Sequence, residues 1–155
     1  VHRKLRPTGS ERVIWGDADR GFFPTAGTPW GTMASLICWE SYMPLARAAL
    51  YEKGVTLYLS PNTNDNPEWQ DAVRHIAREG RCFFINADLF FTRDMYPAHL
   101  RETAEVQPLP QPVWDREEII FAELDMTQAA AAKMELDVCG HYARPDVLRL
   151  TVNDR

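Results

Sequence analysis

Residues 32–60 read TMASLICWESYMPLARAALYEKGVTLYLS, and this stretch predicts a strand, a helix and a second strand. Residues 32–38 form a compact apolar run, which is typical of a buried strand. Residues 44–53 begin with a proline suited to a first helical turn, and Gly54 suits the helix C-terminus. Residues 55–60 are the second apolar run. Because such units connect neighbouring parallel strands, we expect an α/β fold.

The same pattern continues for one more helix and one more strand. Residues 61–67 (PNTNDNP) are dense in turn formers and predict a loop. Residues 68–81 carry apolar side chains on one face, as in an amphipathic helix. Residues 82–87 (CFFINA) then predict a third buried strand. The order strand, helix, strand, helix, strand indicates a parallel sheet as the centre of the domain.

The flanking segments carry weaker signals. The proline-rich segment 92–114 argues against regular structure over that length. An alanine-rich segment predicts one more helix, at 127–134. Residues 1–12 and 21–29 predict loop, the second with an irregular edge strand as the alternative. Short apolar or alternating runs predict three further strands, at 13–15, 118–124 and 147–152.

Composition narrows the class of protein. The chain has 155 residues, 45% of them hydrophobic and 25% charged, which fits one globular domain. A net charge of -5 argues against binding to nucleic acid or to anionic membranes. Apolar runs stay shorter than the roughly 18 residues of a membrane span. The three cysteines are far apart and odd in number, so we expect free thiols, no cysteine zinc site and a cytoplasmic location.

Cys38 is the residue best placed to carry chemistry. It stands at the C-terminal end of a predicted strand and just before a helix, where open α/β sheets bind ligands. The start of a helix also favours the thiolate. A small core residue is the alternative interpretation, but Trp39 and Glu40 are unusual directly after a core strand. Of the histidines, His99 and His141 stay open as partners of Cys38, because spacing selects neither.

Four ordered motifs give the chain a family resemblance. They are HRKLRPT with Glu11-Arg12 near the N-terminus, CWESYMPLAR from Cys38, RHIAREGRC from Arg74, and GHYARPD from Gly140. Together they span nearly the whole chain, and they resemble the nitrilase family of carbon–nitrogen hydrolases. The resemblance implies a four-layer αββα sandwich, here incomplete. It also implies Cys38 as nucleophile, Lys4 as catalytic lysine and Glu11 as a supporting glutamate.

The resemblance implies hydrolysis of a small nitrile to an acid and ammonia, without a cofactor or a metal ion. The thiolate of Cys38 would attack the nitrile carbon, giving a thioimidate and then a thioester. Lys4 and the backbone N–H of Trp39 would stabilise negative charge on the substrate. Asn62 and Thr63, in the loop after the second strand, would contact the substrate. The family implies homo-oligomers, either dimers or spirals.

Two departures from the family qualify this prediction. The family's general-base glutamate lies upstream of the lysine motif, and residues 1–155 hold no counterpart in register. A strand and hairpin that precede the segment resembling WDRE also lack a counterpart near residues 111–114. We therefore expect a partial domain, the C-terminal part of a nitrilase, whose turnover on its own is impaired.

Other functions remain open on these residues. Within the family, a cyanide hydratase or dihydratase and an amidase are the alternatives to a nitrilase. Outside it, a non-catalytic fragment or assembly subunit is the alternative, because the general base is missing. An inert core thiol would react slowly with a mild electrophile, so the reactivity of Cys38 separates this last alternative from the enzymes.

Overall fold

The computed structural model describes residues 2–19, 21, 23–64, 67–89, 92–100 and 121–153. Its centre is a four-stranded sheet with the order β1-β2-β3-β4. Strand β1 pairs antiparallel with β2, whereas β2, β3 and β4 run parallel. The strands span Thr25–Thr28 (β1), Gly31–Ser35 (β2), Leu57–Asn62 (β3) and Phe83–Asp88 (β4).

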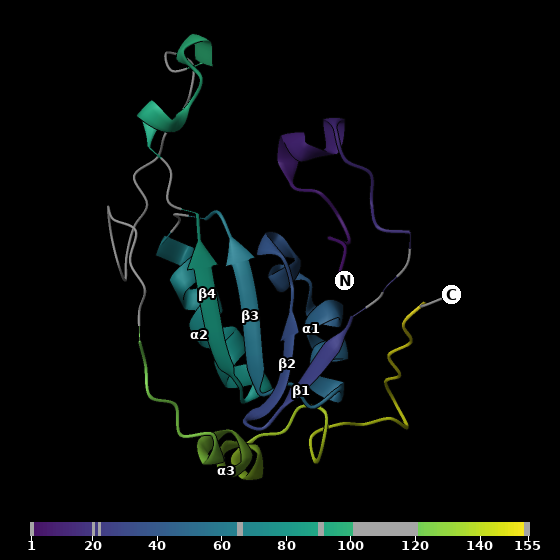
Figure 1. Cartoon of the computed structure of the whole chain (residues 1–155). Helices are drawn as coiled ribbons and strands as arrows, with labels where there is room; N and C mark the ends of the chain where they lie inside the picture. The colour runs from purple at the N-terminus through teal and green to yellow at the C-terminus, as the bar shows by residue number, and fades with distance from the viewer. Residues whose placement is uncertain are drawn as a thin grey trace.

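Helices join the parallel strands. Helix α1 links β2 to β3, helix α2 links β3 to β4, and both lie on the same face of the sheet (Figure 1). The helices are η1 (Gly9–Val13), η2 (Cys38–Tyr42), α1 (Pro44–Glu52), α2 (Pro67–Gly80), η3 (Arg93–Met95), η4 (Ala98–Leu100) and α3 (Thr127–Glu135). The predicted strand–helix–strand–helix–strand order is confirmed. So is the alanine-rich helix, which Figure 1 places at the end of the sheet opposite the tips of β3 and β4.

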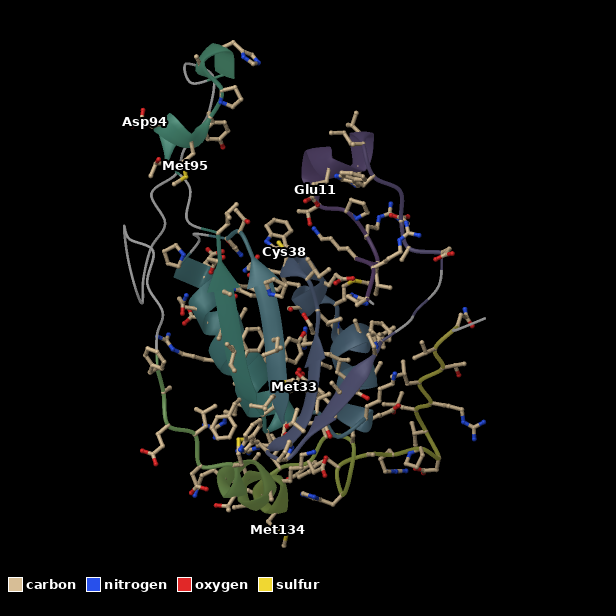
Figure 2. The ribbon with its side chains drawn as sticks, viewed as in Figure 1. Glu11, Met33, Cys38, Asp94, Met95 and Met134 are labelled. Carbon is tan, nitrogen blue, oxygen red and sulfur yellow. The ribbon has the colours of Figure 1, made fainter. Side chains whose placement is uncertain are left out.

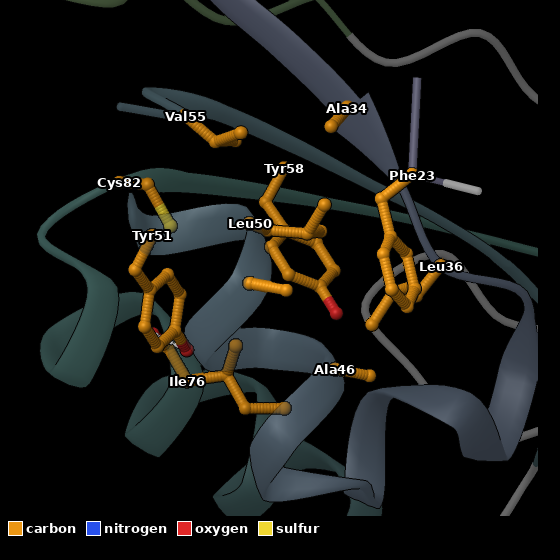
Figure 3. Close-up of a cluster of buried hydrophobic side chains, with 11 residues drawn as sticks. Phe23, Ala34, Leu36, Ala46, Leu50, Tyr51, Val55, Tyr58, Ile76 and Cys82 are labelled. Carbon is orange, nitrogen blue, oxygen red and sulfur yellow. Dashed lines mark hydrogen bonds between the residues drawn. The ribbon is translucent and has the colours of Figure 1, made fainter. Parts of the chain in front are cut away.

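The hydrophobic core lies between the sheet and helices α1 and α2 (Figure 3). Tyr58 of β3 is fully buried there and stacks on Phe84 of β4, with ring centroids 4.7 Å apart. Burying apolar surface of this kind is the main favourable contribution to folding. The buried members of the cluster are Phe23, Ala34, Leu36, Ala46, Ala49, Leu50, Tyr51, Val55, Tyr58, Ile76 and Cys82.

The turn between β1 and β2 depends on a glycine. Gly31 has a φ of +140°, a conformation that L side chains rarely adopt, and a Cβ atom there would collide with the hydroxyl of Thr56. Residues 29 and 30 form the turn itself. Strand β1 is therefore held next to β2 by a tight connection, and the predicted irregular edge strand is a regular one over four residues.

Three predicted strands are wrong where the structure describes them. Residues 13–15 end and follow the 3-10 helix η1, and their apolar side chains are exposed. Residues 121–124 form no strand, and residues 118–120 lie outside the described part of the chain. In residues 147–152 the alternation does turn Leu150 and Val152 towards the core, while Leu148 is 75% exposed. Alternation alone forms no strand, because a strand also needs backbone partners along its length.

The described residues form one sheet and one layer of helices, which is half of the four layers expected from the resemblance. The face of the sheet opposite the helices carries apolar side chains, and Ile85 on it is 45% exposed. The fold is thus mixed α/β and incomplete, as predicted. The expected gap near residues 111–114 lies outside the described residues. Among the residues placed by the structure, no helix has the length and apolarity to cross a membrane.

Candidate active site

Cys38 lies just beyond the end of β2 and is the first residue of η2. Its φ is +57°, which places a non-glycine residue in the left-handed region. Such a conformation costs about 1–3 kcal/mol and persists only where surrounding contacts hold it. A sharp, strained turn between a strand and a helix is a geometry that exposes a nucleophile at the carboxyl end of the strands. Figure 2 shows Cys38 at the end where the parallel strands terminate.

The buried side chain of Glu40 stabilises this turn through hydrogen bonds. Its side chain is only 2% exposed, and its Oε2 accepts the backbone N–H of Ile37 at 2.7 Å. The same oxygen lies 2.9 Å from Nε2 of His2, and Oε1 accepts the backbone N–H of Leu5. One carboxylate therefore connects the N-terminal segment to the turn that carries Cys38. Glu40 stands out in the sequence as unusual after a core strand, but the sequence alone assigned it no role.

Lys4 and Glu11 form the ion pair that the resemblance implies. Nζ of Lys4 donates to Oε2 of Glu11 at 2.7 Å and to the hydroxyl of Thr8 at 2.9 Å. The hydrogen bond from Lys4, followed by that from the backbone N–H of Thr8, lowers the pKa of Glu11. Glu11 is therefore ionised at neutral pH and keeps the ammonium group in place. In Figure 2 Glu11 lies at the same end of the sheet as Cys38.

Strand β3 ends beside the turn with a buried amide. Asn62 was predicted to lie in a loop, but it is the last residue of β3 and is 7% exposed. Its Oδ1 accepts the backbone N–H of Thr63 at 2.9 Å, and Nδ2 has no hydrogen-bond partner among the described residues. Ser60 of the same strand lies 3.5 Å from Ser41 of η2, between the two hydroxyl oxygens, so the end of β3 packs against the turn that carries Cys38. A buried amide donor without a partner is uncommon and suits a ligand.

Aromatic side chains surround the same end of the sheet. Trp39 is 52% exposed and meets Tyr42 edge to face, with ring centroids 6.0 Å apart. Tyr42 in turn meets the buried Trp69 of α2 at 5.2 Å. Burial, followed by the charge of Glu68, raises the pKa of Tyr42. Tyr42 was not singled out from the sequence, although its position four residues after Cys38 on a helical turn was available as a signal.

The histidines left open as partners of Cys38 lie elsewhere. His141 packs its ring against Tyr142 at 4.8 Å, in the C-terminal segment that follows α3. His99 lies in η4, which stands apart from β2 in Figure 1. His75 of α2 has an exposed side chain, 3.7 Å from the carboxylate of Glu79. The candidate site therefore consists of Lys4, Glu11, Cys38, Trp39, Glu40 and Asn62.

The chain has two further thiols. Cys82 is buried directly before β4, and burial raises its pKa to about 12. Cys139 is half-buried, and its pKa is raised by burial and then by the charge of Glu52. Among the described residues, no three or more His, Cys, Asp or Glu side chains cluster as a metal site would. Cys38, in its strained turn at the strand end, is the candidate for nucleophilic chemistry.

Comparison with known proteins identifies the family. The sequence profile of the carbon–nitrogen hydrolases matches residues 1–134. An aliphatic nitrilase of Sinorhizobium fredii (strain HH103) is 43% identical, over 99% of this chain and 56% of that protein. Nitrilase 2 of Arabidopsis thaliana is 41% identical, over 99% and 52%. A bifunctional nitrilase/nitrile hydratase of Oryza sativa subsp. japonica is 40% identical, over 99% and 49%.

A solved structure is also similar: a single-residue mutant of an amidase of the nitrilase superfamily from Nesterenkonia AN1. The TM-score is 0.47 and the identity 17%, over 55% of this chain and 34% of that one.

The chain spans about half the length of the curated relatives it matches. The alignment with the Sinorhizobium protein extends over 171 positions, more than the 155 residues here, so that relative has residues without a counterpart in this chain. The comparisons do not support the expectation that these residues are the C-terminal part of a nitrilase. The comparisons do support membership of a family, through the matched profile and through identities near 40% across the chain. This chain belongs to the carbon–nitrogen hydrolase family.

Proposed function

We propose that the protein to which this chain belongs hydrolyses a nitrile to a carboxylic acid and ammonia, with Cys38 as nucleophile. The observation that carries the proposal is the left-handed conformation of Cys38 at the end of β2, beside a Lys4–Glu11 ion pair held to the same turn. The three relatives described above, two named as nitrilases and one as a bifunctional nitrilase/nitrile hydratase, are each about 40% identical and support the nitrile as substrate.

The proposed reaction proceeds in two halves. The thiolate of Cys38 attacks the nitrile carbon, forming a C–S bond, and the nitrogen takes up a proton to give a thioimidate. Water then adds to that carbon, the C–N bond breaks, and ammonia leaves a thioester. A second water attacks the thioester, the C–S bond breaks, and the acid and the free thiol result. Two water molecules are consumed for each nitrile.

Donors around Cys38 would stabilise the charge that develops on the substrate. The ammonium of Lys4, the backbone N–H of Trp39 and Nδ2 of Asn62 are proposed for this role, and Thr63 fixes the side chain of Asn62 through its backbone N–H. Removing one such donor typically lowers the rate by about 10²–10³-fold. The resemblance places the general base upstream of Lys4, so we assign no residue of this chain to proton abstraction.

An ammonia assay tests the proposal. The full-length protein is incubated with aliphatic, aryl and arylacetonitriles, and ammonia and acid are quantified together. We expect equal amounts of both from at least one nitrile, and none from the Cys38→Ala variant. A folded protein that releases ammonia from no nitrile would contradict the proposal. Amide from a nitrile, formamide from cyanide, or ammonia from amides alone would instead favour a nitrile hydratase, a cyanide hydratase or an amidase.

Thiol reactivity tests the non-catalytic alternative. Iodoacetamide at neutral pH, followed by mass spectrometry of peptides, reports the labelling rate of each cysteine. We expect Cys38 to react first and Cys82 last, because burial raises the pKa of Cys82 to about 12. A Cys38 that reacts as slowly as Cys82 would indicate an inert core thiol. A homo-oligomer and a cytoplasmic location also stay proposals; sedimentation of the full-length protein tests the first and cell fractionation the second.

A further inference from the structure

We propose that Glu40 is a positioning residue that sets the catalytic lysine against the nucleophile. This inference rests on the proposed function and deepens it. Glu40 does not act on the substrate in this proposal. Its carboxylate instead fixes two backbone segments relative to each other, one that contains Lys4 and one that contains Cys38.

The contacts of Glu40 divide between these two segments. Its Oε2 accepts the N–H of Ile37, the residue directly before Cys38, at 2.7 Å. Its Oε1 accepts the N–H of Leu5, the residue directly after Lys4. Each proposed catalytic residue is therefore one peptide unit away from an amide that Glu40 holds. The main-chain bonds, and not side-chain packing alone, fix the two segments.

Nε2 of His2 supplies the third contact, 2.9 Å from Oε2 of Glu40. The His2 ring is itself held by stacking on Phe23, with centroids 5.9 Å apart. The carboxylate is thus bound from both sides of Lys4, at His2 and at Leu5. With 2% exposure, Glu40 has little access to water, so these contacts are not weakened by solvent.

A carboxylate suits this position better than any other side chain. It is an acceptor with two oxygens and can bind several donors at once. Charge-assisted bonds from backbone N–H groups are also stronger than bonds between neutral groups. The bond to Ile37 closes the turn in which Cys38 keeps its φ of +57°. Glu40 therefore stabilises a strained nucleophile and places its cationic partner with the same group.

Glu40→Gln is the variant that tests this role. Glutamine has the same reach, but its NH₂ group donates, so it cannot accept from the N–H groups of both Leu5 and Ile37, which bind different oxygens of Glu40. Misplacing a catalytic group by about 1 Å costs about 100-fold in rate, and we expect a loss of that size in kcat with KM little changed. The alkylation profile of Cys38, meaning the time course of its reaction with iodoacetamide at neutral pH, should also change, because the turn that presents the thiol loses a backbone hydrogen bond.

Glu79→Gln is the matched control. Glu79 is also a carboxylate in an ion pair, and its partners Arg47 and Tyr51 belong to α1. Nη1 of Arg47 also donates to the carbonyl of Ser41 in η2 at 2.9 Å, but Glu79→Gln leaves both groups of that bond in place. This variant should lose stability while keeping kcat and the alkylation profile of Cys38. Glu40→Asp, which keeps the charge and shortens the side chain, replaces Glu40→Gln if the latter does not fold. Near-ultraviolet circular dichroism and thermal melts establish the folded fraction.

The outcomes separate this inference from the proposed function. Unchanged kcat and alkylation profile in folded Glu40→Gln would overturn the inference while leaving nitrile hydrolysis intact. Equal losses of kcat per folded molecule in Glu40→Gln and Glu79→Gln would also overturn it, because they would indicate a general effect of core ion pairs. Absence of turnover in the wild type would reject the proposed function. The alkylation profile would then decide the role of Glu40 by itself.

Discussion

Two carboxylates of this small domain, those of Glu79 and Glu40, are held in different ways. Glu79 projects from α2 and binds the side chains of Arg47 and Tyr51 on α1, at 2.8 and 2.9 Å. Glu40 projects from the turn after β2 and binds backbone N–H groups of Leu5 and Ile37. The first pair of contacts fastens two helices. The second fastens the segments that contain the proposed catalytic residues.

The partners of the two carboxylates indicate which one affects packing and which one affects the proposed catalytic residues. Side-chain partners such as Arg47 and Glu79 fix how two helices pack, and apolar residues of similar volume often serve equally well there. A carboxylate that collects backbone donors sets the path of the main chain itself. We therefore expect substitutions around Glu79 to change stability, and substitutions around Glu40 to change chemistry.

The largest expected effect is at Cys38. Cys38→Ala removes the proposed nucleophile, and loss of a nucleophile can cost about 10⁶-fold in kcat. Its free energy of unfolding should stay close to that of the wild type, since the side chain is half-exposed. Ammonia release and urea unfolding measure the two quantities. Residual turnover well above background would show that another group supplies the attack.

The next largest effect is expected at Lys4. Lys4→Met keeps the aliphatic stem and removes the cation, so kcat should fall by about 10²–10³-fold. Lys53→Met is the control, because Nζ of Lys53 also makes a hydrogen bond, to the carbonyl of Phe23 at 2.6 Å. Steady-state kinetics measure kcat for both variants, and Lys53→Met should keep the wild-type value. Comparable losses of kcat in both would argue against a specific role for Lys4.

A smaller effect is expected in the helix layer. Arg47→Met leaves Glu79 without its cation, which should cost about 2–3 kcal/mol of unfolding free energy. This is below the ~3–5 kcal/mol of a fully buried pair, because the Glu79 side chain remains 27% exposed. Arg47→Met also removes the hydrogen bond from Nη1 to the carbonyl of Ser41 in η2, so a loss of kcat is expected, but a much smaller one than in Glu40→Gln. Urea unfolding and kinetics on the same sample measure both quantities, and a loss of kcat as large as that of Glu40→Gln would contradict the distinction between the two carboxylates.

The smallest effect is expected in acid. Burial by itself raises the pKa of Glu79, but hydrogen bonds from Arg47 and Tyr51 outweigh it and lower the pKa below 4.5. The stability that ionised Glu79 contributes is therefore present above about pH 4.5 and is lost as the pH falls through the folded value. The difference in unfolding free energy between wild type and Glu79→Gln should narrow below pH 4.5. A constant difference down to about pH 3 would contradict this.

The sequence predicted the central fold because local patterns and tertiary packing agree there. Apolar runs at 32–38, 55–60 and 82–87 are long enough, and spaced by helices, to require a parallel sheet. The runs at 13–15 and 147–152 also carry apolar residues, but among the described residues neither forms a strand on the edge strands β1 and β4. Their conformation depends on neighbours that local pattern does not contain.

Some residues of the candidate site could be named from the sequence, and others only from the structure. Cys38, Lys4 and Glu11 were named from the sequence, since their motifs resemble a known family, and the structure joins Lys4 to Glu11 directly. The role of Glu40 was not predicted. A glutamate two residues after Cys38 has no visible relation to Leu5, which lies 35 positions earlier in the chain. Contacts between backbone and side chain at that separation exist only after the chain has folded.

The sequence by itself determined the residue types, the order of strands and helices, and the identity of the nucleophile motif, because each depends on neighbours a few positions apart. Only the tertiary structure decided the left-handed φ of Cys38, the burial of Glu40 and the unpartnered amide of Asn62. These arise where three segments distant in the chain meet at the end of a sheet. Buried polar groups need hydrogen-bond partners, and at this site the partners come from other segments of the chain. The sequence of any one segment therefore cannot show which groups will be paired.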